Sequence, residues 1–114
     1  MDVVVTVPKS FGLKQWIHEG DPAGTPWSGQ LWAFYFGGAK PNIKVGERVY
    51  VVCEGKLRGY APLHRLDWDG NRGAFIRKGN AVAVTLKETV TGFRGWRYRW
   101  WDYTQEIPFP DWKI

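Results

Sequence analysis

Short strand-like segments follow one another through most of this chain, and only a few turn residues separate them. Residues 48–54 and 57–66 are rich in strand-forming side chains, and the pair Gly55-Lys56 between them predicts a hairpin. A second turn signal, Asp69-Gly70-Asn71, follows soon after. Because strands joined by such short turns lie side by side, we expect a small barrel rather than a doubly wound sheet.

Further strands and one short helix complete the expected fold. Three consecutive valines predict a buried strand in residues 2–7, and residues 81–86 and 93–101 predict two more strands. Residues 11–19 have the apolar spacing of a helix, whereas the aromatic run 31–36 fits either a strand or a helix. The expected fold class is therefore α+β, a mixed or antiparallel β-barrel of about five to six strands with one or two short helices.

The chain length bounds the organisation of the protein. Its 114 residues suit a single domain that spans residues 1–114. The one cysteine, Cys53, cannot form an internal disulfide and is no basis for a zinc site, so no metal or other cofactor is expected. Residues 1–8 lack the basic start of a signal peptide, and no run of about 18 apolar residues exists. We expect a soluble, cytoplasmic protein with no membrane partner.

Positive charge is concentrated in the middle of the chain. Residues 1–55 carry five basic and five acidic side chains, whereas residues 56–99 carry ten basic and three acidic ones. The remaining residues, 100–114, have a net charge of −2, and the whole chain has +5. A local excess of arginine favours a polyanion as partner, because phosphate contacts gain Coulomb attraction and release counterions. The alternative is an ordinary solubilising surface.

Residues 93–101 combine aromatic and basic side chains at period two. If this segment is one strand, Trp96, Tyr98 and Trp100 share one face, and Arg97, Arg99 and Trp101 share the other. Such a strand could stack bases and contact phosphates, or its aromatic face could simply pack in the core. The arginines expected to contact phosphate are Arg58, Arg94, Arg97 and Arg99.

Tryptophans in irregular surroundings are candidates for the walls of a ligand pocket. Trp16 lies on the expected helix, and Trp27 lies in the loop of residues 21–30, so the two rings could face each other. Each ring could equally belong to the core. The candidate ligand-binding residues are Trp16, Trp27, Trp32, Ser10, Lys9 and His18.

Two segments resemble a known superfamily. Residues 43–51 (Ile-Lys-Val-Gly-Glu-Arg-Val-Tyr-Val) and 55–61 (Gly-Lys-Leu-Arg-Gly-Tyr-Ala) are similar to the first hairpin of PUA-like domains, particularly the EVE and ASCH branches. Residues 5–11 (Val-Thr-Val-Pro-Lys-Ser-Phe) are similar to the start of EVE domains, and the resemblance covers residues 2–66. Gly46 and Gly59 also have a physical reason, since a closing barrel needs tight turns and bends.

The resemblance implies a β-pseudobarrel that presents a cleft to RNA, or to a modified base displaced from its strand. Some ASCH relatives hydrolyse modified nucleosides with a lysine, a threonine and a glutamate. Lys56, Thr85 and Glu54 are the matching residue types in this chain.

The sequence favours binding over catalysis. His18 and His64 are far apart, and no nucleophile elbow or phosphate-binding glycine loop is present. Cys53 lies among valines, where an inert buried thiol is expected, and His64 is expected at the surface. The leading hypothesis is a nucleic-acid-binding module for RNA or DNA, with a modified base as one form of the ligand. The alternatives are a small nucleoside hydrolase and a protein-interaction domain.

Overall fold

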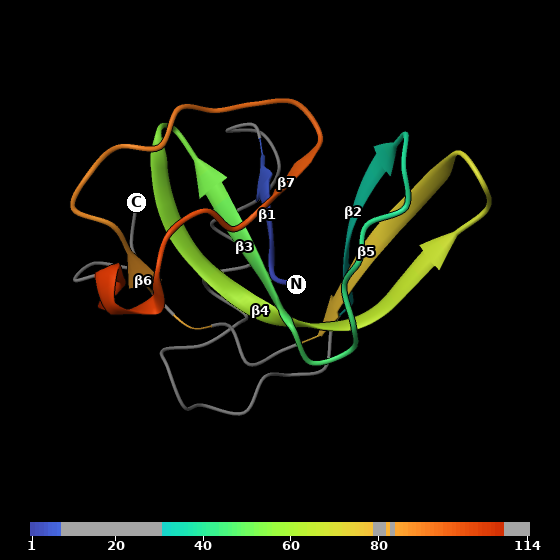
Figure 1. Cartoon of the computed structure of the whole chain (residues 1–114), viewed down its shortest axis with the longest axis horizontal. Helices are drawn as coiled ribbons and strands as arrows, with labels where there is room; N and C mark the ends of the chain where they lie inside the picture. The colour runs from blue at the N-terminus through green and yellow to red at the C-terminus, as the bar shows by residue number, and fades with distance from the viewer. Residues whose placement is uncertain (8–30, 79–81, 83, 109–114) are drawn as a thin grey trace.

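The strands form one curled, mixed sheet with the order β2-β5-β4-β3-β1-β7, and a second sheet pairs β6 with β8 (Figure 1). The computed structural model describes residues 1–7, 31–78, 82 and 84–108. The elements are β1 (Val3–Thr6), β2 (Leu31–Gly37), β3 (Arg48–Cys53), β4 (Lys56–Trp68), β5 (Arg72–Lys78), β6 (Val84–Thr85), β7 (Trp96–Tyr98), the 3₁₀ helix η2 (Tyr103–Gln105) and β8 (Ile107–Pro108).

Two antiparallel hairpins build the middle of the sheet. At the β3–β4 turn, Glu54 and Gly55 both have positive φ, of 53° and 75°. At the β4–β5 turn, Gly70 has a φ of 108°, and Asp69 Oδ1 accepts hydrogen bonds from the amides of Asn71 and Arg72 at 3.3 and 2.9 Å. The second turn is confirmed, and so is the first hairpin, but its turn consists of Glu54 and Gly55, and Lys56 already belongs to β4. The strand β5 that follows the second turn was not expected from the sequence.

Strand β1 lies inside the sheet, parallel to β3 and antiparallel to β7. Its three valines are 0% exposed, and Val4 packs into a different core cluster from Val3 and Val5. A strand that is covered on both faces needs apolar side chains at odd and at even positions, which explains the unbroken valine run. The predicted buried first strand is confirmed, and the sheet is mixed.

Strand β4 is long and bends, so that it belongs to both halves of the sheet (Figure 1). Its pairing register shifts once opposite Val51 and Val52 and again between Leu63 and Arg65. Such bulges bend a strand and increase its twist. Next to the first bulge, Gly59 has a φ of 146°, and Gly46 has 90° at the turn before β3. The two glycines thus take the conformations that the sequence predicted at bends and turns.

Aromatic side chains join the two ends of the curled sheet. The ring of Trp96, on β7, contacts the rings of Phe36 on β2 and Phe75 on β5, each with centroids 6.3 Å apart. These two strands stand at the far end of the sheet order from β7. The result is a half-barrel whose inside is filled by one core cluster. This β-rich architecture is compatible with the expected small barrel.

The C-terminal part differs from the expected strands. Of residues 93–101 only Trp96–Tyr98 joins the sheet, since Gly95 has a φ of 72° just before it. The alternation of packed and exposed side chains does not continue after this strand. Trp101 is buried in the second core cluster, whereas Trp100 is 54% exposed. Residues 93–101 are therefore not one strand, and Trp100 does not share the face on which Trp96 and Tyr98 pack against the core.

Helix is nearly absent from the part of the chain that the structure describes. The expected helix at residues 11–19 lies outside the described residues, and the aromatic run 31–36 is strand β2. Within the described ranges the helix is η2, of three residues. None of the helical segments described has the length and apolar character needed to cross a bilayer.

Candidate functional site

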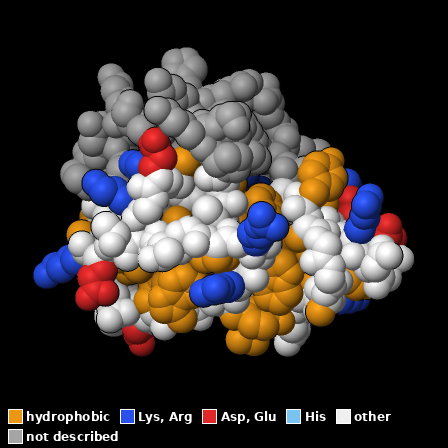
Figure 2. All heavy atoms as spheres, turned by 90° about the horizontal axis from the view of Figure 1, so that it is seen from above, with side chains coloured by type: hydrophobic (Ala, Val, Ile, Leu, Met, Phe, Trp, Pro, Cys, Tyr) orange, Lys and Arg blue, Asp and Glu red, His pale blue; other side chains and the backbone are white. Residues whose placement is uncertain are grey.

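A group of aromatic and basic side chains lies on and beside β7, and we call it the aromatic–arginine surface: Phe93, Arg94, Arg97 and Trp100. Phe93 is partly buried, and the other three are exposed. The guanidinium carbon of Arg97 lies 4.6 Å from the centre of the Phe93 ring. The Phe93 ring contacts Trp100 edge to face, with centroids 6.0 Å apart. The segment before β7 runs along the top of the molecule in Figure 1. Figure 2 looks down on that side and shows Lys and Arg side chains among apolar ones.

The structure separates the four arginines that the sequence assigned to phosphate. Arg94 and Arg97 are exposed, and neither forms an ion pair with another residue in the described part of the chain. Arg58 is 7% exposed, donates from Nε to the Cys53 carbonyl at 3.2 Å, and pairs with Glu54 at 3.7 Å.

Arg99 is also engaged inside the protein. Its Nε lies 3.3 Å from Asp2 Oδ2, and it donates to the Trp101 carbonyl. Its guanidinium carbon lies 4.0 Å from the Tyr103 ring centre. Arg58 and Arg99 therefore stabilise the fold, and Arg94 and Arg97 are the two that face solvent.

The buried Glu106 carboxylate fixes the segment that carries Trp100. It accepts hydrogen bonds from the Tyr50 hydroxyl at 2.5 Å, Trp101 Nε1 at 2.8 Å and Arg48 at 3.2 Å. Burial, and then the bond to Glu106, raises the pKa of Tyr50, so its hydroxyl stays protonated and remains a donor. Because Trp101 is held in the core in this way, its neighbour Trp100 is kept at the surface.

A second carboxylate, Asp2, ties the start of β1 to the same region. It accepts hydrogen bonds from the Arg48 amide at 2.8 Å and the Tyr103 hydroxyl at 2.7 Å. Burial alone would raise its pKa, but these bonds and Arg99 outweigh burial and lower it. The Arg48 guanidinium lies between the rings of Tyr60 and Tyr103, at 4.1 and 4.5 Å from their centres. This network gives the aromatic–arginine surface a rigid base.

Most of the pocket residues predicted from the sequence lie outside the described residues. These are Lys9, Ser10, Trp16, His18 and Trp27. Trp32 belongs to β2 and pairs in register with Arg77 of β5, although its side chain is not among those described. Burial lowers the pKa of the Arg77 guanidinium to about 10.

Two of the three candidate catalytic residues, Glu54 and Lys56, lie at the β3–β4 turn, and the third, Thr85, lies on β6. Glu54 and Lys56 are exposed on either side of Gly55, and Glu54 pairs with Arg58. Thr85, on β6, is 9% exposed, and its hydroxyl lies 3.5 Å from the Leu86 carbonyl. The contacts of Glu54 and Thr85 are thus with the protein itself.

Cys53 and His64 have the surroundings that the sequence indicated. Cys53 is 2% exposed, and burial raises the pKa of its thiol, as expected for an inert cysteine. His64 is exposed, as predicted, and stands at the second bulge of β4. Across the described ranges, no three His, Cys, Asp or Glu side chains are grouped so that they could hold a metal ion.

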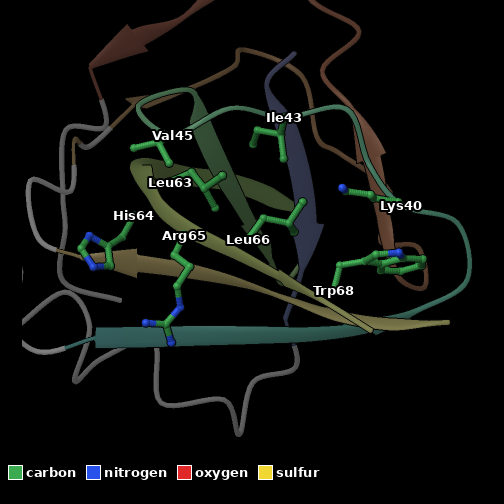
Figure 3. Close-up of a pocket in the computed structure, with 8 residues that line it drawn as sticks. All are labelled: Lys40, Ile43, Val45, Leu63, His64, Arg65, Leu66 and Trp68. Carbon is green, nitrogen blue, oxygen red and sulfur yellow. The ribbon is translucent and has the colours of Figure 1, made fainter. Parts of the chain in front are cut away.

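A hollow beside β4 was missed by the sequence analysis, and we call it the Trp68 hollow (Figure 3). Its volume is about 630 Å³. The connection from β2 to β3 and the second half of β4 supply its lining residues, which are Lys40, Ile43, Val45, Leu63, His64, Arg65, Leu66 and Trp68. No local sequence pattern predicts this hollow, because its two walls are distant in sequence and meet only when β4 bends.

The fold and these surfaces define a mostly β protein with a curled six-stranded half-barrel and an exposed group of arginine and aromatic side chains. No protein-family model, curated protein or solved structure matches the chain. Membership of the PUA-like superfamily therefore stays a prediction from the resemblance.

Proposed function

We propose that this protein binds single-stranded nucleic acid, RNA or DNA, on the aromatic–arginine surface. The observation that carries the proposal is the position of Trp100, which is 54% exposed and contacts the ring of Phe93, on which the exposed Arg97 rests. An exposed ring of this size offers a stacking face to any base, and each stacked base stabilises a complex by about 1–3 kcal/mol.

The neighbouring arginines supply the second element of such a site. Arg97 rests on the Phe93 ring, so its guanidinium is oriented before a ligand arrives while its N–H groups stay available to phosphate. Arg94 lies in the bend that leads into β7, the strand that carries Arg97. Since no carboxylate in the described residues neutralises either arginine, a phosphate would meet two unshielded charges.

The network beneath the surface supports binding by lowering its entropic cost. Glu106 holds Trp101, and Trp101 contacts Trp100 edge to face with centroids 5.0 Å apart. A side chain that is already restrained loses less freedom when a base stacks on it. A surface whose charges served only solubility would not need an aromatic ring restrained by the residues beneath it.

The test measures the affinity for fluorescent single-stranded RNA and DNA, and for a duplex, at two or more salt concentrations. Single strands should bind, with an affinity that falls steeply as salt rises. Trp100→Ala should weaken binding about fivefold to a hundredfold, as expected for one lost stack. Arg97→Gln should weaken it on all sequences alike and reduce the salt slope by about one.

Tyr35→Ala is the matched control, because Tyr35 is also an exposed ring, at 78%, but lies on β2 at the opposite end of the sheet. This variant should bind like the parent protein. The proposal fails if affinity does not respond to salt, or if Trp100→Ala and Tyr35→Ala bind equally well. Salt-insensitive capture of another protein through Trp100 would instead identify a protein-interaction surface.

A further inference from the structure

The two outermost strands of the curled sheet, β2 and β7, differ in how they end it. Within the described part of the chain, each of them pairs with one neighbouring strand of the sheet. Strand β7 has three residues, one of them Arg97, and Gly95 interrupts the extended chain before it with a φ of 72°. A short edge that carries a charge resists pairing with another chain, because an incoming strand finds few groups to bond and must bury the charge.

Strand β2 lacks these protective features. Its seven residues, Leu-Trp-Ala-Phe-Tyr-Phe-Gly, include no charged residue and no proline. They pair with β5 one for one, without a bulge. A long, regular and apolar edge is a ready template for another strand, and proteins generally shorten, charge or cover such edges. The free edge of β2 is therefore a candidate interaction surface.

The pairing register shows which backbone groups of β2 point to this edge. The Gly38 amide donates to the Asn71 carbonyl at 3.0 Å and continues the one-for-one pairing with β5. Along an antiparallel strand the N–H and C=O groups of successive residues alternate in direction. Those of Phe36 therefore point toward β5, whereas those of Ala33 and Tyr35 point away from it. An added strand would bond to the groups of Ala33 and Tyr35.

Strand β2 is also complementary to a second copy of itself. In an antiparallel pair whose two-fold axis passes through Phe34, Tyr35 of one chain lies opposite Ala33 of the other. In the same way, Gly37 of one chain lies opposite Leu31 of the other. The Tyr35 ring, which is 78% exposed, would thus lie beside a small side chain, and no like charges would meet.

We infer that this protein forms a two-fold dimer in which the β2 strands of two copies pair antiparallel and join the two sheets. A second copy fits this edge better than a foreign peptide, because the register that pairs the most residues places the exposed ring opposite a small residue. The dimer is closed, since each copy contributes one β2 edge. So small an interface should have a dissociation constant on the order of 10 μM. The inference does not rest on the proposed function, because nanomolar binding assays would observe the monomer.

Sedimentation velocity of the whole protein, from nanomolar to high micromolar concentration, measures the dimer. The parent protein should change from monomer to dimer without larger species. Tyr35→Lys and Tyr35→Glu should each stay monomeric, because the two introduced charges of a homodimer would be diagonal neighbours across the strand pair. An equimolar mixture of the two variants should dimerise about tenfold more tightly than either variant alone, because its neighbouring charges are opposite.

Val45→Lys is the matched control, because Val45 is also an exposed apolar residue, at 72%, but lies in the turn before β3. This variant should dimerise like the parent protein. A parent protein that stays monomeric at high concentration, or that grows beyond the dimer, would overturn the inference. Dimerisation of Tyr35→Lys at the parent's concentration, or a mixture of the charge variants that associates no better than either one, would do the same.

Amide hydrogen exchange distinguishes self-pairing from coverage of the edge by another part of the same chain. The amides of Ala33 and Tyr35 should exchange fast in dilute protein and slowly in concentrated protein. The amides of Phe34 and Phe36 should be protected at both concentrations, because they point toward β5. Protection of Ala33 and Tyr35 in the dilute monomer would mean that the edge is already covered, and it would contradict the dimer.

Discussion

Asp2 is a single residue whose ionisation should stabilise the fold. Its pKa is lowered below the ordinary value of 3.8 in the folded protein, so the unfolded chain binds a proton more readily. The stabilisation is complete above pH 3.8 and is lost as the pH falls through the folded pKa. We expect Asp2→Asn to lower the free energy of unfolding at pH 7 by about 1–3 kcal/mol and to flatten its fall below pH 4.

Urea denaturation at pH 7 and at several pH values below 4 measures this effect. Glu88→Gln is a suitable control, since Glu88 is an exposed carboxylate outside the Asp2 network. It should reproduce the acid sensitivity of the parent protein. An Asp2→Asn variant that loses stability in acid as steeply as the parent would show that Asp2 is not the group responsible.

At the scale of elements, Gly73 of β5 allows the neighbouring strands β2 and β4 to come close to it on both sides. A Cβ at this position would lie 2.6 Å from the Asp67 carbonyl oxygen as well as from the Phe36 ring. The carbonyl belongs to the backbone of the paired strand and cannot turn away. Gly73→Ala should therefore lower the free energy of unfolding by about 2–3 kcal/mol, as overpacked sites do.

Gly37→Ala is the matched control for this prediction. Gly37 is also a strand glycine next to the hairpin, but a Cβ there would meet its nearest neighbour, the Asn71 carbonyl oxygen, at 3.9 Å. Its effect should stay within about 0.5 kcal/mol. Chemical denaturation of both variants gives the comparison, and equal losses would mean that the crowding at Gly73 relaxes at no cost.

At the scale of the whole molecule, Trp96 should hold the two ends of the curled sheet together. Its ring contacts Phe36 and Phe75, which belong to strands at the other end of the sheet. Trp96→Ala should lower the free energy of unfolding by about 3 kcal/mol, because a large, partly buried side chain that packs against the core is lost. Removing the exposed ring in Tyr35→Ala should cost less than about 0.5 kcal/mol.

Amide hydrogen exchange distinguishes closure of the half-barrel from local packing. If Trp96 joins the ends, its removal should speed exchange in β2 and β5 as well as in β7. Faster exchange confined to β7 would mean that Trp96 stabilises its own strand and little else.

Local patterns were sufficient for much of the β-structure. Both hairpin turns follow from Gly55 and from Asp69-Gly70-Asn71, because a positive φ or a side-chain turn bond is a property of a few neighbouring residues. The valine run of β1 likewise predicts burial on two faces. Strand β5 was missed, since its seven residues include two arginines, a lysine and a glycine, and they form a strand because β2 and β4 pair with them on both sides.

The candidate sites depended on contacts between distant segments. The sequence established that arginines and tryptophans are concentrated near β7, and it treated Arg94, Arg97 and Arg99 alike. Their different environments arise because Asp2, far away in the chain, pairs with Arg99 and leaves the other two exposed. The Trp68 hollow likewise exists because the bend of β4 meets the β2–β3 connection. Turn and strand propensities act between neighbours in the chain, whereas exposure of a charge depends on which remote segments fold over it.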